Sequence, residues 1–343
     1  MPERPRVLLL CGGPSAEHDV SLASARSLLA ATGDRVAWLP RVISRRGHWL
    51  DAHHSLSRLT RTTGDDRGTT GEAGPRLDLA ALADVDAVFP LLHGPYGEDG
   101  RLQGALEVLG VPYVGSSVLA SAVGMDKLAM KALFREAELP QVAYRGVTRH
   151  RWGTQREAVD AELDGLGWPA FVKPANLGSS IGIARVADRS ERDAAIEEAF
   201  AHDRRVIVEA AASGARELEV AVLGLDDPRT SVVGEIHTDA AFYDYAAKYT
   251  PGAASLDVPA DVPAPVADAC RAYARRAFQA IDGAGLARVD LFWQPERDAL
   301  WVNEINTMPG FTETSMFPRL WAATGLAYPD LALHLIELAR TAR

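Results

Sequence analysis

Short apolar runs recur along the chain, and most of them end in a glycine turn or in a charged residue. Runs of this length and composition are typical of strands buried in a sheet. They predict strands at residues 6–11, 36–42, 85–92, 111–114, 170–173, 183–186, 206–209, 217–223, 231–237, 287–293 and 300–305. Apolar residues at helical spacing predict helices between them, at residues 17–31, 102–109, 118–138, 191–200, 266–281 and 328–339. Strands that alternate with helices predict an α/β fold.

The first strand and helix are joined by the turn Gly12-Gly13. A strand, a glycine turn and a helix form a Rossmann-like start, in which a ligand lies at the carboxyl end of the strand. The dinucleotide fingerprint G-x-G-x-x-G is absent, which argues against a nicotinamide oxidoreductase. A second glycine-rich turn, at residues 93–100, follows the strand at residues 85–92 and predicts another ligand-binding edge.

The length of 343 residues is too great for one small core, and we expect three domains, at residues 1–121, 122–214 and 215–343. The net charge is 36 − 46 = −10, which argues against a nucleic-acid or anionic-membrane partner. The two cysteines, Cys11 and Cys270, lie in different predicted domains and form no disulfide framework. We recognise neither a signal peptide nor a membrane-spanning run, and we expect a cytoplasmic protein.

Two acidic strands near the C-terminus form a candidate metal site. Glu304 and Asn306 lie two residues apart in an apolar strand, so both side chains point to one face of the sheet. Asp290 lies within another apolar strand just upstream. Carboxylate and amide oxygens together suit a hard cation such as Mg²⁺. The same residues would also fit a solvated strand edge, and on their own they leave both interpretations open.

Residues 176–182 form a candidate phosphate-binding loop. Its glycines let backbone N–H groups approach an anion, and the hydroxyls of Ser179 and Ser180 can donate as well. Lys173, just before the loop, and Lys127, on a helix, would supply positive charge to the same phosphates. An ordinary glycine hairpin and a solvated helical lysine are the alternatives, because the loop lacks the G-K-[ST] ending of a Walker A motif.

Three further side chains could carry chemistry. Arg288 lies two residues before Asp290 and shares its strand face, so with the backbone N–H of Gly310 it makes a candidate oxyanion site. Glu17 lies where a helix begins, and acids at that position often only cap the helix. His93 could be a proton carrier or a neutral, hydrogen-bonded structural histidine.

Taken together, these segments resemble the D-alanine–D-alanine ligase family of the ATP-grasp superfamily. The resemblance covers nearly the whole chain. The matching segments are GGPSAEHDVS at 12–21, HGPYGEDG at 93–100, MDK at 125–127, VKP at 172–174, LGSSIG at 177–182, FYDYAAKY at 242–249, RVD at 288–290 and NEINTMPG at 303–310. Each segment is short, but all eight follow the family's order, and this makes the resemblance specific.

The resemblance implies a three-domain ATP-grasp ligase with a Rossmann-like N-terminal domain, and with ATP held between the central and C-terminal domains. The implied ATP-binding residues are Lys127, Lys173 and Ser180 for the phosphates, Glu209, Ala210 and Ala212 for the adenine, and Glu217 for the ribose. The implied metal ligands are Asp290, Glu304 and Asn306, which would bind two Mg²⁺ or Mn²⁺ ions.

The resemblance also implies where the amino-acid substrates bind. The implied catalytic residues are Glu17, Ser179 and Tyr249, which would form a hydrogen-bonded triad, and Arg288 with the Gly310 amide, which would stabilise the oxyanion. The implied substrate-binding residues are His93 near the first D-alanine, and Lys248 and Ser315 at the carboxylate of the second. The implied reaction joins two D-alanines through a D-alanyl phosphate, for peptidoglycan precursor synthesis, and the family is usually homodimeric.

Two departures from the family pattern keep alternatives open. Ala210-Ala211-Ala212 follow Glu209, where the family usually has a lysine and a bulky residue, and this predicts weaker adenine stacking. Ala246 stands where an acid is common, although Tyr249 favours the dipeptide-forming branch. The competing interpretations are a second substrate such as D-lactate or D-serine, and a non-catalytic nucleotide-binding paralogue. The complete set of predicted metal ligands, together with Arg288, argues against the paralogue.

Overall fold

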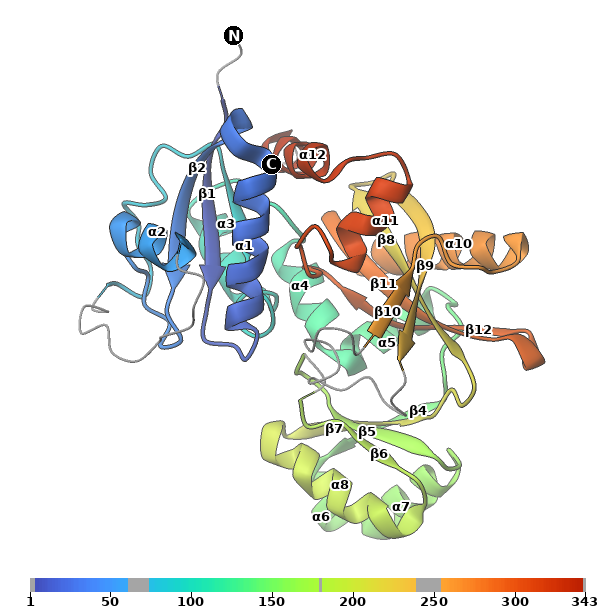
Figure 1. The fold of residues 1–343 in the computed structure, drawn as a ribbon. Coiled ribbons are helices and arrows are strands. Elements are labelled where there is room, and N and C mark those ends of the chain that lie inside the picture. The colour runs from blue at the N-terminus through green and yellow to red at the C-terminus, as the bar shows by residue number, and fades with distance from the viewer. Residues whose placement is uncertain (1–3, 61–73, 179–180, 239–253, 342–343) are drawn as a thin grey trace.

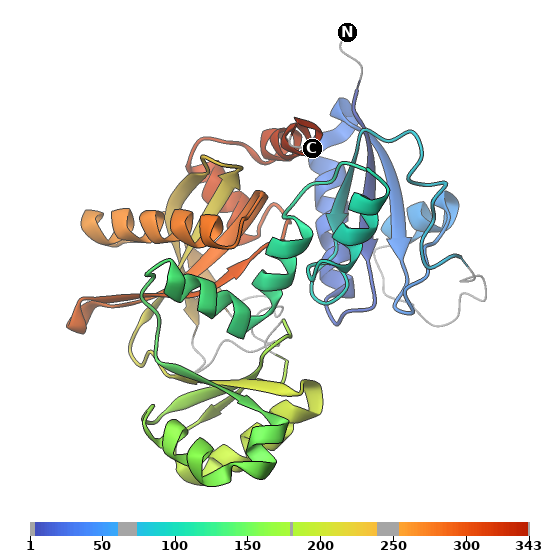
Figure 2. The same ribbon diagram turned by 180° about the vertical axis from the view of Figure 1, so that it is seen from behind.

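The structure, a computed structural model, describes residues 4–60, 74–178, 181–238 and 254–341. The described residues form three sheets, with the strand orders β2-β1-β3, β4-β7-β5-β6 and β10-β9-β8-β11-β12 (Figure 1). Figure 2 shows the same arrangement from behind, with helices packed against each sheet. The mixed helix-and-sheet fold predicted from the sequence is confirmed.

The N-terminal sheet is parallel, as a short apolar strand followed by a glycine turn predicts. Its strands are β1 (Arg6–Gly12), β2 (Ala37–Ile43) and β3 (Ala87–Leu91). The helices of this part are α1 (His18–Thr32), α2 (Ala52–Thr60) and α3 (Arg101–Val108), with the 3₁₀ turn η1 (Gly33–Arg35) after α1. Helix α1 packs on β1, so its N-terminus lies at the carboxyl edge of the sheet, where α/β folds bind ligands.

The central sheet is antiparallel and carries its helices on one face (Figure 1). Its strands are β4 (Tyr144–Thr148), β5 (Ala170–Pro174), β6 (Ala184–Val186) and β7 (Arg205–Ala210). The helices are α6 (Arg149–Thr154), α7 (Arg156–Asp164) and α8 (Arg189–His202). The candidate phosphate loop connects β5 to β6, as predicted.

The C-terminal sheet is antiparallel and lies between two helices. Its strands are β8 (Arg216–Gly224), β9 (Arg229–Thr238), β10 (Ala254–Asp257), β11 (Gly285–Gln294) and β12 (Ala299–Asn306), with the turn η2 (Pro295–Arg297) before β12. Helix α10 (Ala264–Ala280) packs on this sheet, and α11 (Met316–Ala323) packs on β8 and β9. The final helix, α12 (Tyr328–Thr341), packs against α1 and β3.

An aromatic cluster joins the two ends of the chain. Phe311 is fully buried, and its ring centroid lies 5.4 Å from Phe89 of β3 and 5.5 Å from Tyr328 of α12. The hydroxyl of Tyr328 donates to the carbonyl of Phe311 at 2.6 Å. The turn after β12 is therefore fixed against the N-terminal sheet. The domain boundaries at residues 121 and 214 stay predictions.

Two predicted elements differ from the structure. Residues 118–138 form two helices, α4 (Val118–Met125) and α5 (Lys127–Glu136), rather than one. Asp126 breaks the helix because its backbone is extended and its side chain accepts the N–H of Ala129 at 3.0 Å as an N-cap. Residues 111–114 are not a strand, because only Tyr113 pairs, with Val88.

Candidate active site

A cavity of about 1500 Å³ is lined by residues of the central and C-terminal sheets and, from the N-terminal part, by residues of α1 and of the turns beside its sheet. The predicted site residues in its lining are Glu17, His93, Lys127, Lys173, Glu209, Ala210, Ala212, Glu217, Arg288, Asp290, Glu304, Asn306, Gly310 and Ser315. The predicted residues Ser179, Ser180, Lys248 and Tyr249 lie outside the described residues. Every predicted site residue that the structure describes therefore reaches one cavity.

Arg288 lies at the centre of a charged cluster on β11. Its Nε and Nη2 atoms lie 2.7 and 2.8 Å from the two carboxylate oxygens of Asp290, and Nε lies 3.0 Å from Oε1 of Glu219 on β8. Burial alone would lower the pKa of Arg288, but the charges of Asp290 and Glu219 outweigh it and raise the pKa well above its usual value. The guanidinium is thus a permanently charged group, held in a fixed orientation by two carboxylates.

The three candidate metal ligands come together through the register of two strands. Asp290 of β11 lies opposite Glu304 of β12, and Arg288 lies opposite Asn306. All three ligand side chains line the cavity, and β12 is the edge strand of its sheet, so the metal site stays a prediction. Two carboxylates and an amide offer oxygen atoms, the donor set that Mg²⁺ and Mn²⁺ prefer. These residues fit a divalent cation.

Glu17 precedes α1, yet its side chain makes no capping hydrogen bond, so helix capping is the wrong interpretation. Its carboxylate lies against two glycine turns instead. The Oε2 atom would be 2.9 Å from a Cβ added at Gly94 and 4.0 Å from one added at Gly178. Gly94 has a φ of +76°, where a side chain would be strained as well as too close to the carboxylate. Glu17 therefore faces the cavity beside the phosphate-loop candidate.

His93 is buried, and both of its ring nitrogens have neighbours. Nδ1 lies 3.0 Å from the carbonyl oxygen of Met308, which can only accept, so Nδ1 carries the proton. Nε2 lies 3.3 Å from the hydroxyl of Ser24. Burial lowers the pKa of His93 and favours the neutral ring, although the charge of Glu17 opposes this. The geometry supports the structural interpretation of His93 rather than that of a proton carrier.

Glu98, for which the sequence suggested no role, lies in the same lining. Its Oε2 atom accepts the N–H of Gly94 at 2.5 Å. Burial, and then the charge of Glu17, raise the pKa of Glu98 well above its usual value. The neutral acid is therefore favoured for Glu98, and Glu17 and Asp19 are the other carboxyl groups of this part of the lining.

Lysines approach the end of the cavity that lies beside the candidate phosphate loop. Lys173 Nζ lies 2.6 Å from Glu209 Oε2, and Lys131 Nζ lies 2.8 Å from Oε1 of the same carboxylate. Burial alone would raise the pKa of Glu209, but the two ammonium groups lower it to about 2. Lys127 Nζ donates to the carbonyl of Leu177 at 2.6 Å, where the phosphate loop begins. The carboxylate of Glu209 is thus held by two lysines, and its role at the adenine stays a prediction.

The backbone after β7 presents two different polar groups. The N–H of Ala210 donates to Ala143 at 2.9 Å, and the carbonyl of Ala212 accepts the N–H of Ala215 at 3.0 Å. These contacts occupy the N–H of Ala210 and the carbonyl of Ala212.

Ser315 and Gly310 lie together in the turn after β12. The Ser315 hydroxyl lies 2.7 Å from the hydroxyl of Thr312, and a Cβ added at Gly310 would lie 3.3 Å from Ser315 Oγ.

Sequence reasoning missed Glu219, Lys131 and Glu98. Glu219 could have been found, because it lies two residues after Glu217 in an apolar strand and so shares its face. Lys131 is four residues after Lys127 and shares its helix face, but a lysine there predicts only a solvated charge. Nothing local in the sequence marks Glu98 as buried.

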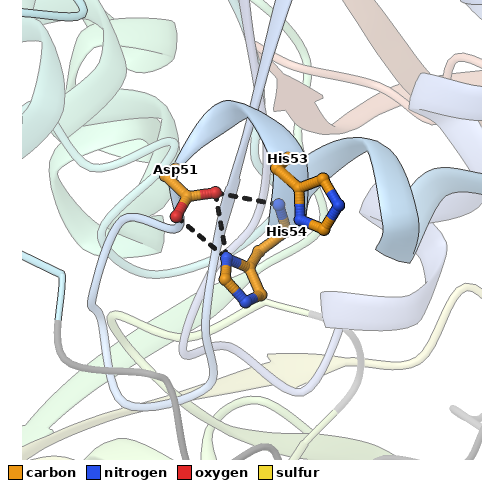
Figure 3. Close-up of side chains that lie close together, drawn as sticks. All are labelled: Asp51, His53 and His54. Carbon is orange, nitrogen blue, oxygen red and sulfur yellow. Dashed lines mark hydrogen bonds and ion pairs between the residues drawn. The ribbon is translucent and has the colours of Figure 1, made fainter.

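Within the part of the chain that the structure describes, two other groups of side chains lie close enough together to share a metal ion. In the first, Asp51, His53 and His54 are exposed at the start of α2 (Figure 3). Asp51 accepts the backbone N–H of His54 and its ring Nδ1, both at 2.9 Å. These contacts are those of a helix cap, and they explain the group without a metal.

The second group is Glu235, His237 and Asp257, on β9 and β10. Both oxygens of Glu235 are already held by the guanidinium of Arg216, with Nε at 2.7 Å. His237 Nε2 lies 2.8 Å from Asp257. These ion pairs are the contacts of the group, as the pair of Arg288 with Asp290 is in the predicted metal site, and we propose no cation here.

Comparison with known proteins matches the two halves of the chain to one family. The model of the D-ala D-ala ligase N-terminus matches residues 6–116, and that of the D-ala D-ala ligase C-terminus matches residues 133–337. The chain belongs to the D-alanine–D-alanine ligase family. The resemblance in sequence and the ATP-grasp ligase fold are thereby confirmed, and the family uses ATP and a divalent cation.

Similar proteins cover the chain almost completely. D-alanine–D-alanine ligase of Deinococcus radiodurans is 51% identical over 338 residues, 97% of this chain and 98% of the relative. That of Bacillus cytotoxicus is 46% identical, over 96% and 94%. The crystal structure of the VanG D-Ala:D-Ser ligase from Enterococcus faecalis has a TM-score of 0.82 and 32% identity, over 98% of this chain and 100% of that one. The D-alanine–D-alanine ligase structure from Coxiella burnetii has a TM-score of 0.80 and 34% identity, over 98% and 94%.

Proposed function

We propose that this protein is an ATP-dependent ligase that joins two D-alanines into D-alanyl-D-alanine, for peptidoglycan precursor synthesis. The observation that carries the proposal is the one cavity that holds a carboxylate for an ammonium group, lysines for phosphates and an oxygen-rich site for a divalent cation. The two relatives named D-alanine–D-alanine ligase, at 51% and 46% identity, support the choice of substrate.

The chemistry requires activation of a carboxylate, because a carboxylate is a poor electrophile. An oxygen of the first D-alanine takes the γ-phosphoryl group of ATP and gives a D-alanyl phosphate and ADP. The amine of the second D-alanine attacks the carbonyl carbon, the C–N bond forms, and the C–O bond breaks as phosphate leaves with its electron pair. Arg288 and the amide of Gly310 stabilise the oxyanion between these two events.

Asp290, Glu304 and Asn306 would hold the divalent cation, and we propose two Mg²⁺ or Mn²⁺ ions. A cation bound there supplies charge neutralisation for the transferred phosphoryl group. Arg288 contacts both oxygens of Asp290 and so fixes the direction in which that carboxylate faces the cavity. Magnesium keeps waters and phosphate oxygens as further ligands, so three protein oxygens suffice.

The nucleotide would lie between the central and C-terminal sheets. The Ala210 carbonyl and the Ala212 N–H form an acceptor and a donor, which match the amino group and ring nitrogen of adenine. Glu217 would hold the ribose, and Lys127 and Lys173 the phosphates, with Ser180 as a predicted further donor.

The first D-alanine would place its ammonium at Glu17. Glu98, whose pKa is raised by burial and by the charge of Glu17, lies in the same part of the lining. His93 fixes the Met308 backbone beside it. The triad of Glu17 with Ser179 and Tyr249, and the binding of the second carboxylate by Lys248 and Ser315, stay predictions.

The test is phosphate release from Mg-ATP with D-alanine alone, with the product mass measured in the same tube. We expect phosphate release and the mass of D-alanyl-D-alanine. Parallel tubes add D-serine or D-lactate, because one structural relative is a D-Ala:D-Ser ligase. ATP binding without phosphate release in the D-alanine tube would overturn the proposal, and release only with a second acceptor would assign that acceptor instead.

We also propose that the protein acts in the cytoplasm as a homodimer without a nucleic-acid partner. Among the described residues, no helix combines the length and apolar character needed to cross a bilayer. Light scattering on the purified chain would give a mass near twice 36.9 kDa if the dimer is correct, and near 36.9 kDa if it is not.

A further inference from the structure

Lysine is rare in this chain. Only four of its 36 basic residues are lysines, at positions 127, 131, 173 and 248, and the remaining 36 − 4 = 32 are arginines. Lys127 and Lys173 line the cavity, and Lys248 lies outside the described residues. Lys131 is the member of this small set that neither the sequence nor the proposed reaction explains.

Lys131 cannot reach a ligand in the cavity. It lies on α5 with 1% of its surface exposed, and it is absent from the cavity lining. Its ammonium faces Glu209 Oε1 at 2.8 Å and the ring of Tyr144, whose centroid is 5.4 Å away. A buried ammonium costs free energy unless it is paired, so this position needs an explanation.

Glu209 is the link between Lys131 and the cavity. It is 3% exposed, and its second oxygen lies 2.6 Å from Lys173, which does line the cavity. One carboxylate is therefore shared by two ammonium groups, and the three side chains together carry a charge of +1. Without Lys131, Glu209 would pair with Lys173 alone, and the pair would carry no net charge.

We propose that Lys131 is a positioning residue for nucleotide binding: it occupies one oxygen of Glu209, so that Lys173 keeps its positive charge available to the phosphates of a nucleoside triphosphate. A lysine suits this place because its ammonium is compact, whereas the planar fork of an arginine would bind both oxygens of Glu209 and displace Lys173. The inference rests on the proposed function only in requiring that the cavity binds a nucleotide.

The inference predicts that nucleotide affinity follows the summed charge of the three side chains. Lys131→Met lowers this charge to zero, and we expect the Kd for Mg-ADP or a non-hydrolysable ATP analogue to rise roughly 10-fold, or about 1.4 kcal/mol. Lys131→Met combined with Glu209→Gln restores +1, and the Kd should return to within about threefold of the unmodified protein. Glu209→Gln alone gives +2 and should bind at least as tightly as the unmodified protein.

The experiment is isothermal titration calorimetry of these variants, without D-alanine, with thermal unfolding recorded for each. Arg192→Met is the matched control, because Arg192 is a buried cation of the central part, 2% exposed, that is absent from the cavity lining. It should lose thermal stability and keep the Kd. Where Lys131→Met does not fold, Lys131→Gln replaces it, since glutamine can donate to Glu209 without a charge.

A packing role for Lys131 gives a different result, because the double variant would then bind more weakly than either single variant. That result, or a Kd for Lys131→Met equal to that of the unmodified protein, would overturn the inference. Failure of the unmodified protein to bind nucleotide would instead overturn the proposed function, so the two failures are distinguishable.

Discussion

Replacement of Arg288 separates its observed ion pairs with Asp290 and Glu219 from its proposed role in stabilising the oxyanion. Its fork contacts both oxygens of Asp290 at 2.7 and 2.8 Å, and it also contacts Glu219 at 3.0 Å. The side chains are 17% exposed for Arg288 and Asp290 and 5% for Glu219. Removal of the cation takes the arginine away from a buried carboxylate, that of Glu219, and a partly buried one, that of Asp290; breaking a buried ion pair typically costs about 3–5 kcal/mol of folding stability. Loss of an oxyanion donor typically lowers kcat by roughly 10²–10³.

Arg288→Lys and Arg288→Met should therefore behave differently. The lysine variant keeps a charge but loses the two-pronged contact, so we expect a loss of about 1–3 kcal/mol in the free energy of unfolding. Its kcat should still fall by roughly 10², because a single ammonium cannot fill the geometry of the fork. The methionine variant should show the full stability loss, and Glu219→Gln added to it should recover stability but not kcat.

The assays are urea unfolding followed by circular dichroism and phosphate release at saturating ATP and D-alanine. A folded Arg288→Lys variant whose kcat stays within about threefold of the unmodified protein would refute the oxyanion role. Equal recovery of stability and kcat on adding Glu219→Gln would refute the separation of the two tasks.

Three further outcomes are expected. Phe311→Ala removes a fully buried ring that joins the turn after β12 to the N-terminal sheet. Urea unfolding should show a free energy of unfolding lower by about 3–5 kcal/mol, and a loss under about 1 kcal/mol would contradict the packing described. Burial alone would raise the pKa of Glu209, but Lys131 and Lys173 lower it from an ordinary value of 4.5 to about 2. The stability that the Glu209 carboxylate contributes is therefore present above pH 4.5 and is lost as the pH falls toward 2. Glu209→Gln should remove this part of the acid-unfolding curve, and a curve unchanged by the substitution would contradict the prediction. Asn306→Ala should raise the Mg²⁺ concentration needed for half-maximal phosphate release, while EDTA stops release in every variant; an unchanged Mg²⁺ requirement would remove Asn306 from the metal site.

The sequence was most informative where the site depends on side chains that alternate between the two faces of a strand. Arg288 and Asp290 share a face because they are two residues apart, and so do Glu304 and Asn306, and the structure pairs the two strands with these residues opposite one another. Their chemistry could therefore be predicted before the fold was known.

Contacts between distant segments could not be predicted in this way. Lys131 and Glu209 are 78 residues apart, and the pairing that makes Lys131 more than a surface lysine depends on how α5 packs beside the central sheet. Asp126 was placed inside a helix because the apolar spacing continues across it, but its short side chain caps a new helix instead. The pKa of Glu98 is raised mainly by burial. Glu98 lies in a turn, where no helical or strand spacing shows from the sequence which side chains are buried.

The most direct test of the proposed chemistry follows the carboxylate oxygen atoms of D-alanine rather than the rate of the reaction. D-alanine labelled with ¹⁸O in both carboxylate oxygens is incubated with Mg-ATP and the enzyme, and the released phosphate is analysed by mass spectrometry. If the carboxylate takes the γ-phosphoryl group and an amine then displaces phosphate, one ¹⁸O atom passes to each phosphate. The dipeptide then keeps three ¹⁸O atoms, one in its peptide carbonyl and two in its C-terminal carboxylate. Unlabelled phosphate would mean that water, not the carboxylate, received the phosphoryl group, and it would contradict the acyl-phosphate mechanism.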